Sequence, residues 1–283
     1  MARGDDMSLK LMYITNRPEI AQIAESAGVD RIFVDMEYIG KDKRQGGLDT
    51  VQSHHTIDDV KTIRSAIVKA ELLVRVNPIH DATDDYCSSE IEIDKTIHAG
   101  ADIIMLPFFK TVDEVKRFIK VVNGRARTML LFETPQAVEN LDEILKLSGI
   151  DEVFIGLNDL SLGYGRKFMF ELLSDGTVER ICNKFKEYRL PYGFGGIASL
   201  GKGMIPSEKV IKEHYRLGST CVILSRSFCN VNQISHMGVI SSTFVNGVND
   251  IRRFEEECNR YASYFSENQV EIADIVKQIS GNG

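Results

Sequence analysis

The chain has 283 residues, 43% hydrophobic and 27% charged, a balance typical of a globular domain with a full apolar core. Asp and Glu number 41 against 34 Lys and Arg, and this formal charge of −7 argues against a nucleic-acid binder, which usually carries a basic stripe. No run approaches the roughly 18 apolar residues of a membrane span. The polar first residues contain no secretory signal, and the five cysteines form no C-x-x-C pair. We therefore expect a cytoplasmic protein that binds neither membrane nor nucleic acid.

Eight short apolar runs alternate with amphipathic stretches along the chain. Each run is almost continuously apolar, as expected for a parallel strand that is buried on both faces. The spacing between runs is roughly 20 to 40 residues, the size of a βα unit. The runs cover residues 9–15, 30–36, 71–76, 102–108, 127–133, 151–157, 191–197 and 220–226.

The stretches between the runs carry helix start and stop signals. Residues 111–114 (TVDE) match a capping box, and Pro135 follows Thr134 at a plausible first helical position. Glycines fall where helices should end before the next strand, at positions 28, 100, 149 and 218. This pattern predicts an α/β fold, a (β/α)8 TIM barrel. A doubly wound sheet is the alternative, but the glycine-rich segment 193–196 lacks the G-x-G-x-x-G spacing of its first turn.

Beyond Arg226 the pattern changes. Residues 229–247 are expected to form a polar connection, followed by a helix that is capped at Asn249 and carries an apolar stripe to Phe265. We expect one barrel domain over residues 1–283 with a C-terminal helical tail over 229–283. The tail helix packs either on its own barrel or, as a swapped element, on a neighbouring subunit.

Two acidic residues follow neighbouring strands at the carboxyl end of the barrel, where such folds carry their chemistry. Glu133 ends the fifth run and Asp159 follows the sixth, so the two carboxylates should emerge about 4.8 Å apart. A divalent cation with water or substrate as further ligands would relieve their repulsion, and so would a shared proton. Alternatively, Asp159 caps a helix and Glu133 pairs with a nearby Lys or Arg.

Arg75 lies at the end of the third run, where the surrounding residues are apolar. A buried guanidinium requires an anion. That anion is either a carboxylate or enolate oxygen of a substrate, or the side chain of Asp35 or Glu37 from the second run.

Seven segments in order make the chain resemble the HpcH/HpaI aldolase and citrate lyase β-subunit superfamily, over roughly residues 10–226. The segments are AGVD (27–30), VDME (34–37), LVRVNP (73–78), AGADIIMLP (99–107), FET (132–134), NLDEI (140–144) and GIDEVFIGLNDLS (149–161).

The resemblance implies a metal-dependent lyase. Glu133 and Asp159 would bind Mg²⁺ or Mn²⁺, which a 2-oxo acid such as pyruvate chelates. Backbone amides near Asn158 and Asp159 would hold the substrate carboxylate, and Arg75 would polarise the 2-oxo oxygen. A cation and a guanidinium on that oxygen would stabilise the enolate that carbon–carbon cleavage leaves, without a Schiff-base lysine. Family members are commonly hexameric, so a homo-oligomer, a hexamer or a dimer-based assembly, is expected.

The chain departs from the family pattern at the residues that move protons. Tyr38 stands where the aldolase branch has its histidine base, Leu131 replaces a glutamine, and Leu157-Asn158 replaces Pro-Ala. A phenol with a pKa near 10 is a weak base at neutral pH. Arg75-Val-Asn-Pro is closer to the citrate lyase branch, although the D-L-E-D signature of that branch is absent.

Histidines near the barrel rim are the other candidates for proton transfer. The long loop of residues 38–56 could fold over the site and supply His55 or its neighbour His54, unless these are solvated cap residues. His80 and a metal-bound hydroxide are further possibilities. The charged run 41–44 is expected to be a solvated loop.

We therefore expect a class II aldolase that cleaves a 4-hydroxy-2-oxo acid into pyruvate, or a similar 2-oxo acid, and an aldehyde. A citramalyl- or malyl-CoA-type lyase is the alternative within the same chemistry, and an isomerase or transferase could use the same enolate. A catalytically inactive barrel that acts as a binding subunit is an alternative of a different class.

Overall fold

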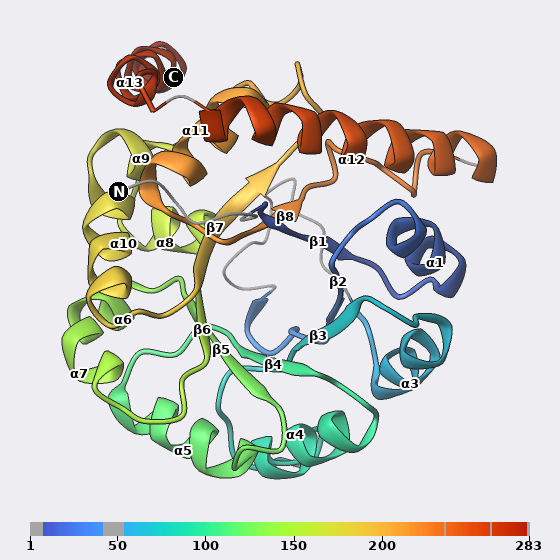
Figure 1. The fold of residues 1–283 in the computed structure, drawn as a ribbon. Helices are drawn as coiled ribbons and strands as arrows, with labels where there is room; N and C mark the ends of the chain where they lie inside the picture. Colours follow the sequence, from blue (N-terminus) through green and yellow to red (C-terminus); the bar gives the residue numbers. More distant parts are fainter. Residues whose placement is uncertain (1–7, 42–53, 235, 261, 282–283) are drawn as a thin grey trace.

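In the computed structural model, which describes residues 8–41, 54–234, 236–260 and 262–281, eight parallel strands close into a barrel in sequence order (Figure 1). The (β/α)8 architecture predicted from the apolar runs is therefore confirmed, and each strand lies within its predicted run. The strands are β1 (Lys10–Ile14), β2 (Arg31–Asp35), β3 (Glu71–Arg75), β4 (Ile103–Leu106), β5 (Arg127–Phe132), β6 (Glu152–Ile155), β7 (Tyr192–Ile197) and β8 (Cys221–Leu224).

Helices surround the barrel, and those that connect the strands form its outer ring (Figure 1). The helices are α1 (Pro18–Ser26), α3 (Ile57–Ala66), α4 (Ser89–His98), α5 (Val112–Val122), α6 (Pro135–Glu139), α7 (Leu141–Leu145), α8 (Leu157–Gly163), α9 (Glu171–Ser174), α10 (Thr177–Glu187), α11 (Ser207–Leu217), α12 (Met237–Arg260) and α13 (Phe265–Gly281).

The predicted helix signals act as their chemistry suggests. Thr111 and Glu114 form a reciprocal capping box at the start of α5, and Pro135 is the first residue of α6. The four helix-ending glycines have φ between +79° and +100°, a region that disfavours other residues. At Gly100 a β-carbon would also lie 2.7 Å from the Arg64 side chain, so both the backbone conformation and the lack of space favour glycine there.

Two apolar layers hold the barrel together. The larger layer lies between the sheet and the helices, and the smaller one fills the barrel interior. The interior residues come from successive strands and are bulky, so the barrel centre is a packed core and any binding site must lie at one end. They are Met12, Phe33, Leu73, Ile103, Met105, Met129, Leu131, Phe154 and Cys221.

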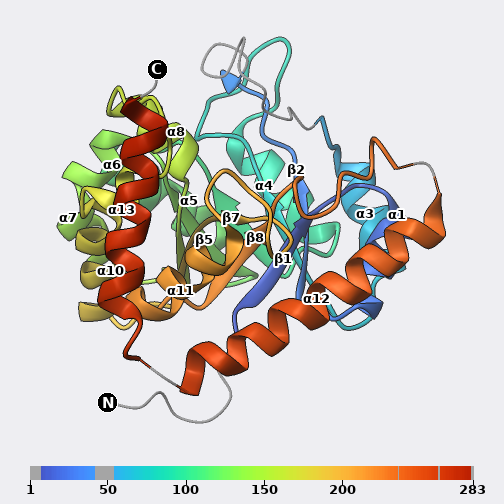
Figure 2. The same cartoon turned by 90° about the horizontal axis from the view of Figure 1, so that it is seen from above.

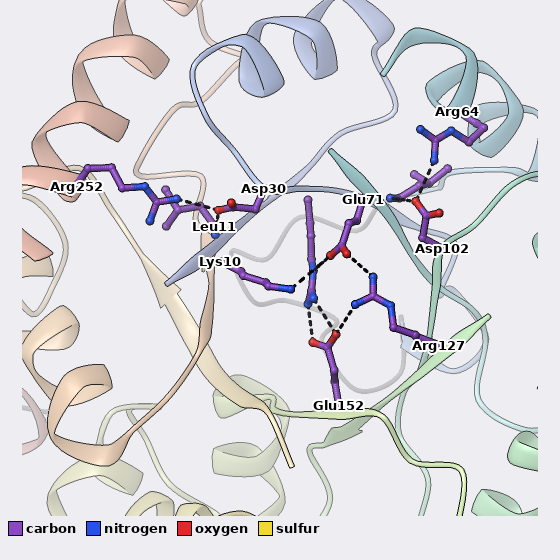
Figure 3. Close-up of polar contacts among 11 residues, drawn as sticks. Lys10, Leu11, Asp30, Arg64, Glu71, Asp102, Arg127, Glu152 and Arg252 are labelled. Atoms are coloured by element: carbon purple, nitrogen blue, oxygen red, sulfur yellow. Dashed lines mark hydrogen bonds and ion pairs between the residues drawn. The ribbon is translucent and has the colours of Figure 1, made fainter. Parts of the chain in front are cut away.

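A charged cluster closes the amino end of the barrel. Lys10, Glu71, Arg127 and Glu152, each the first residue of its strand, point toward one another (Figure 3). At their centre lies Arg31, which is fully buried and binds both carboxylate oxygens of Glu152 at 2.7 and 2.8 Å. We call these five residues the amino-end cluster. It neutralises buried charge at the face opposite to the expected site.

The C-terminal region differs from the expected arrangement. Residues 237–247 are helical, so the prediction of a polar connection over 229–247 is wrong for its second half. Buried Ile240, Phe244, Val248 and Ile251 extend the apolar stripe of α12 toward its N-terminus, and this stripe outweighs the Ser, Asn and Gly residues between them.

Helix α12 runs along the outside of the barrel and packs on α1 and α11, and α13 packs on α9 and α11 (Figure 2). The tail helix therefore covers its own barrel in the chain described here. Exchange of this helix between subunits stays a prediction, since it concerns an assembly of several chains. No helix in the described ranges is both long and apolar enough to cross a membrane.

Candidate active site

The described residues line cavities among the loops that follow the carboxyl ends of the strands, and two of these cavities adjoin each other. The first, which we call the β5–β6 cavity, has a volume of about 250 Å³ and is lined by both Glu133 and Asp159. The second, the β1–β8 cavity, has a volume of about 410 Å³. Arg75 and Ile223 line both cavities, so the two meet at these residues. The structure thus brings together Glu133, Asp159 and Arg75, the three residues that the sequence analysis placed at the barrel rim.

Glu133 follows β5 directly and is held by its neighbours. Its side chain is only 4% exposed, and its Oε1 accepts a hydrogen bond from the Phe108 amide at 3.0 Å. Phe108 has φ +48°, an uncommon backbone conformation for a bulky residue, and such strain is typical of functional sites. A β-carbon on Gly156 would lie 2.7 Å from the other carboxylate oxygen, so only glycine lets Glu133 pack against this segment.

Asp159 lies in the first turn of α8 and is 7% exposed. Its Oδ1 is 3.5 Å from Nδ2 of the Asn158 side chain, and Asn158 lines the β5–β6 cavity beside it. The N-cap of α8 is Gly156. The alternative expectation, that Asp159 caps a helix, is therefore wrong. Glu133 and Asp159 also line a neighbouring hollow of about 320 Å³, so both carboxylates border two cavities.

The two carboxylates fit a hard divalent cation better than a softer one. Within the described ranges, no group of three or more His, Cys, Asp or Glu side chains could hold a metal ion. Mg²⁺ does not require such a group, because it keeps several waters and is usually bound by one or two carboxylates together with substrate oxygens. Glu133 and Asp159 therefore form a donor set suited to Mg²⁺ or Mn²⁺ and poorly suited to a structural zinc ion.

Arg75 is held by the carboxylates that follow β2. Its Nε and one terminal nitrogen donate to the two oxygens of Asp35, both at 2.8 Å, and Glu37 lies 3.4 Å away. Of the partners expected for Arg75, a substrate anion, Asp35 or Glu37, the structure shows Asp35. Burial alone would raise the pKa of the Asp35 carboxyl, but Arg75 and Lys41 outweigh it and keep this pKa below its ordinary value. Arg75 is thus fixed at the junction of the two cavities.

Lys41 is a further residue of the site and was not predicted from the sequence. It is 3% exposed, lies 2.9 Å from Asp35 and 3.6 Å from Glu37, and lines the β5–β6 cavity. The expectation of a solvated loop is therefore wrong for Lys41, and residues 42–44 of that run lie outside the described residues. The i,i+4 spacing of Glu37 and Lys41 was the one signal available, because it places opposite charges on one face of a turn.

Tyr38 is not among the described residues that line either cavity. Its backbone amide donates to Asn77, and its ring, 38% exposed, lies against Tyr86 with 5.5 Å between ring centroids. Burial, reinforced by the Glu92 charge, raises the pKa of the phenol. The structure therefore does not bring Tyr38 to the site, and the raised pKa keeps its phenol protonated, so even less phenolate is available to act as a base at neutral pH.

His54 and His55 both line the β1–β8 cavity. His80 does not reach either cavity, since its ring nitrogens lie 2.7 and 2.8 Å from the carbonyl oxygens of Pro78 and Cys87 in its own loop. The Asp35 backbone amide donates to Nδ1 of His55 at 3.0 Å. An amide nitrogen can only donate, so Nδ1 carries no proton and the neutral ring carries its proton on Nε2. This geometry favours a donor role for His55 over the role of base.

Burial also lowers the pKa of His55, although Asp35 and Asp59 oppose the shift and Lys41 and Arg75 support it. We expect the ring to stay neutral on acidification from pH 7 to below 6.5, and to gain its proton only at lower pH. A ¹H–¹⁵N NMR titration, assigned with His55→Gln, measures both the tautomer and the pKa. Protonation on Nδ1 at neutral pH, or a pKa above 6.5, would contradict this arrangement.

Comparisons with known proteins identify a family and agree with the fold. The model of the HpcH/HpaI aldolase/citrate lyase family matches residues 10–171. A 2-keto-3-deoxy-L-rhamnonate aldolase of Escherichia coli O17:K52:H18 is 22% identical, over 58% of this chain and 64% of the relative, so the match spans less than two thirds of that protein.

Solved structures of the same family share the fold. An HpcH/HpaI aldolase/citrate lyase family protein from Burkholderia cenocepacia J2315 superposes with a TM-score of 0.61 and 15% identity, covering 88% of this chain and 96% of the other. An HpcH/HpaI aldolase from Desulfitobacterium hafniense DCB-2 gives 0.59 and 16%, covering 87% and 93%. At these identities the likeness supports the barrel alone.

Proposed function

Because the chain belongs to the HpcH/HpaI aldolase/citrate lyase family, we propose that it is an aldolase-type lyase that cleaves a 4-hydroxy-2-oxo acid into a 2-oxo acid and an aldehyde. The 2-oxo acid is pyruvate or a close analogue. One observation carries the proposal: Arg75, which ends β3, Glu133, which follows β5, and Asp159, which follows β6, line one cavity at the carboxyl end of the barrel. Two carboxylates that would bind a cation and one guanidinium would therefore lie near the same substrate carbonyl.

Glu133 and Asp159 would hold Mg²⁺ or Mn²⁺ in the β5–β6 cavity. Bound there, a divalent cation would draw electron density from the carbonyl oxygen of the 2-oxo acid. The protein contributes the position of the two ligands. Phe108 holds one oxygen of Glu133, and Gly156 leaves room for the other. This fixed placement reduces the reorganisation needed when substrate binds.

Arg75 would stabilise the charge that develops during the reaction. In cleavage, the 4-hydroxyl gives its proton to solvent water and its oxygen forms the aldehyde carbonyl. The bond between C3 and C4 breaks, and its electron pair forms the enolate, whose charge lies on the 2-oxo oxygen. A proton then returns to C3 and gives pyruvate. The Arg75 guanidinium is positioned by Asp35 and borders the cavity, so its charge can neutralise that oxygen. The amides of Asn158 and Asp159 would hold the substrate carboxylate.

His55 and Lys41 would assist as donors. The neutral His55 ring carries its proton on Nε2 and lines the β1–β8 cavity, where Nε2–H would donate a hydrogen bond to the C4 oxygen as this oxygen becomes the aldehyde carbonyl. Lys41 adds a second buried cation beside Arg75. Lys41 and Arg75 would supply positive charge near the reacting atoms, and His55 a neutral hydrogen-bond donor, without a covalent intermediate.

A substrate screen with added Mg²⁺ or Mn²⁺ tests the proposal. We expect pyruvate release from 4-hydroxy-2-oxo acids and none from citramalyl-CoA or malyl-CoA. Release of an acyl-CoA product instead would favour the thioester lyase, and phosphate release from phosphoenolpyruvate, detected by ³¹P NMR, would favour a transferase. If no substrate reacts, the result would favour the alternative of a catalytically inactive barrel that acts as a binding subunit.

Gly156→Ala should reduce activity by moving Glu133. The added β-carbon would meet Glu133 at 2.7 Å from its Oε2 and 2.8 Å from its Cβ, so the carboxylate must shift. A displacement of about 1 Å can cost roughly 100-fold in rate, and we expect a loss of at least about tenfold in kcat/KM. Gly281→Ala is the control, because its β-carbon would meet nothing within 4 Å. Equal activity of both variants would show that the position of Glu133 is not critical.

A further inference from the structure

Asn77, in the LVRVNP segment (73–78), connects the end of β3 to the segment that follows β2. It is 2% exposed, and its Oδ1 accepts hydrogen bonds from two successive backbone amides, that of Tyr38 at 3.0 Å and that of Ile39 at 2.9 Å. Both amides lie outside any strand or helix, so they require a partner of this kind. One side-chain oxygen therefore holds the start of the segment after β2.

Lys41 is the last residue of a turn that begins at Tyr38, and we call residues 38–41 the 38–41 turn. The Lys41 backbone amide donates to the Tyr38 carbonyl oxygen at 3.1 Å and closes this turn. The Lys41 ammonium lies 2.9 Å from Asp35 and 3.6 Å from Glu37, and it borders the β5–β6 cavity. A lysine side chain is flexible, so the position of its charge depends on how firmly the backbone of the turn is held.

Glu92, in the first turn of α4, fixes the orientation of the Asn77 side chain. Its Oε1 accepts hydrogen bonds from Nδ2 of Asn77 at 2.8 Å and from the Asn77 backbone amide at 3.2 Å. Because Nδ2 is the donor of that side chain, Oδ1 must face the two amides of the turn. Burial raises the pKa of the Glu92 carboxyl, although the hydrogen bonds from Asn77 oppose the shift. A neutral amide with an oxygen in the same place should therefore serve equally well.

The two cations beside Asp35 are held in different ways. Arg75 and Asp35 are paired residues of the neighbouring strands β3 and β2, so the barrel itself aligns them. Lys41 lies outside the strands and reaches Asp35 only through the 38–41 turn. Among the described residues that line the two cavities, neither Asn77 nor Glu92 appears, so neither would touch a substrate.

We propose that Asn77 is a positioning residue, which holds the 38–41 turn so that Lys41 places its charge beside Arg75, and that Glu92 keeps the Asn77 side chain in the required orientation. The use of this charge, stabilisation of the enolate, rests on the proposed function, whereas the position of Lys41 does not. Without Oδ1 of Asn77 the two amides lose their acceptor, and the turn opens more often.

Reductive methylation of lysines, followed by peptide mass spectrometry, tests this position without turnover. Buried Lys41 should react at least about tenfold more slowly than the exposed Lys116. Asn77→Ala should accelerate methylation of Lys41 about tenfold or more and leave that of Lys116 unchanged. Glu92→Gln keeps the acceptor oxygen and should stay close to the wild type, whereas Glu92→Ala should accelerate methylation of Lys41.

Asn268→Ala is the matched control for a general loss of stability. Asn268 is 1% exposed and donates to the buried Glu213 at 2.9 Å, but it lies in α13. We expect no faster methylation of Lys41 in this variant. An unchanged rate in Asn77→Ala, or equal acceleration in Asn268→Ala, would overturn the proposal. Should Asn77→Ala not fold, Glu92→Ala decides: faster methylation than in Glu92→Gln supports the proposal, and an equal rate overturns it.

Deuterium exchange into pyruvate, catalysed by the metal-loaded, full-length protein, separates the two proposals. Asn77→Ala should lower kcat about tenfold or more and change KM less than about threefold, because the Lys41 charge acts on the enolate and the cation ligands Glu133 and Asp159 are untouched. Glu92→Gln should retain the kcat of the wild type. Wild-type exchange with an unchanged kcat in Asn77→Ala would overturn the role of Asn77 and leave the lyase proposal intact. If the wild type catalyses no exchange, the lyase proposal fails and the methylation rates alone decide whether Asn77 positions Lys41.

Discussion

Glu133→Gln and Asp159→Asn should each reduce kcat/KM for aldol cleavage by about 10³-fold or more. Each variant removes one of two charges that would hold the divalent cation, and such cations supply several kcal/mol of charge stabilisation in the transition state. Affinity for Mn²⁺, measured by electron paramagnetic resonance, should fall by more than about 100-fold, because loss of a ligand exceeds the effect of changing its hydrogen-bond partner.

The same variants should leave the fold intact. In Glu133→Gln the side-chain oxygen can still accept the Phe108 amide hydrogen bond, so the free energy of unfolding should change by no more than about 1 kcal/mol. Glu143→Gln is a matched control, since Glu143 pairs with Lys146 on the exposed face of α7. Full activity of Glu133→Gln or Asp159→Asn with normal Mn²⁺ binding would contradict the role assigned to these carboxylates.

Glu152→Gln should produce the largest loss of stability among single substitutions in the amino-end cluster. Arg31 is fully buried and would keep its contact with Glu71 and one hydrogen bond to the remaining side-chain oxygen at position 152, but it would lose the Glu152 charge. Removal of one partner of a buried ion pair typically costs about 3–5 kcal/mol, because the remaining charge is left without compensation. Urea unfolding measures this loss, and the melting temperature should fall by roughly 2–4 °C per kcal/mol.

Two further variants define the cause of that loss. Asp113→Asn breaks an exposed pair with Lys116 and should cost less than about 1 kcal/mol. The double variant Arg31→Met, Glu152→Leu removes both buried charges and should be more stable than Glu152→Gln alone. A double variant that is less stable than the single one would show that the pair stabilises the barrel beyond charge compensation.

The barrel could be predicted because its strands are buried on both faces. The centres of runs such as 71–76 and 127–133, residues 72–74 and 129–132, are entirely apolar, and the lengths and spacing of the runs leave few other folds. Glu133 and Asp159 could be placed for the same reason, since each follows a strand end and the strands are neighbours. The succession of strands along the chain was sufficient to predict both the barrel and the positions of these two carboxylates.

The surroundings of Arg75 could not be predicted in the same way. Lys41 and His55 belong to the long connection after β2, and no periodic pattern specifies how such a connection folds back onto the site. Their partners are Asp35 and its backbone amide, contacts that depend on the tertiary structure. The start of α12 was missed for a different reason, because a stripe of four buried residues outweighs the low helix propensity of the Ser, Asn and Gly between them.

Exchange of the methyl protons of pyruvate in D₂O, followed by ¹H NMR, tests most directly whether the β5–β6 cavity stabilises an enolate. It requires no knowledge of the aldehyde. With added Mg²⁺ or Mn²⁺, the wild-type protein should replace these protons by deuterium far faster than a sample that contains the metal alone, and Glu133→Gln should not. Exchange that is no faster with the protein than without it would contradict the proposed chemistry.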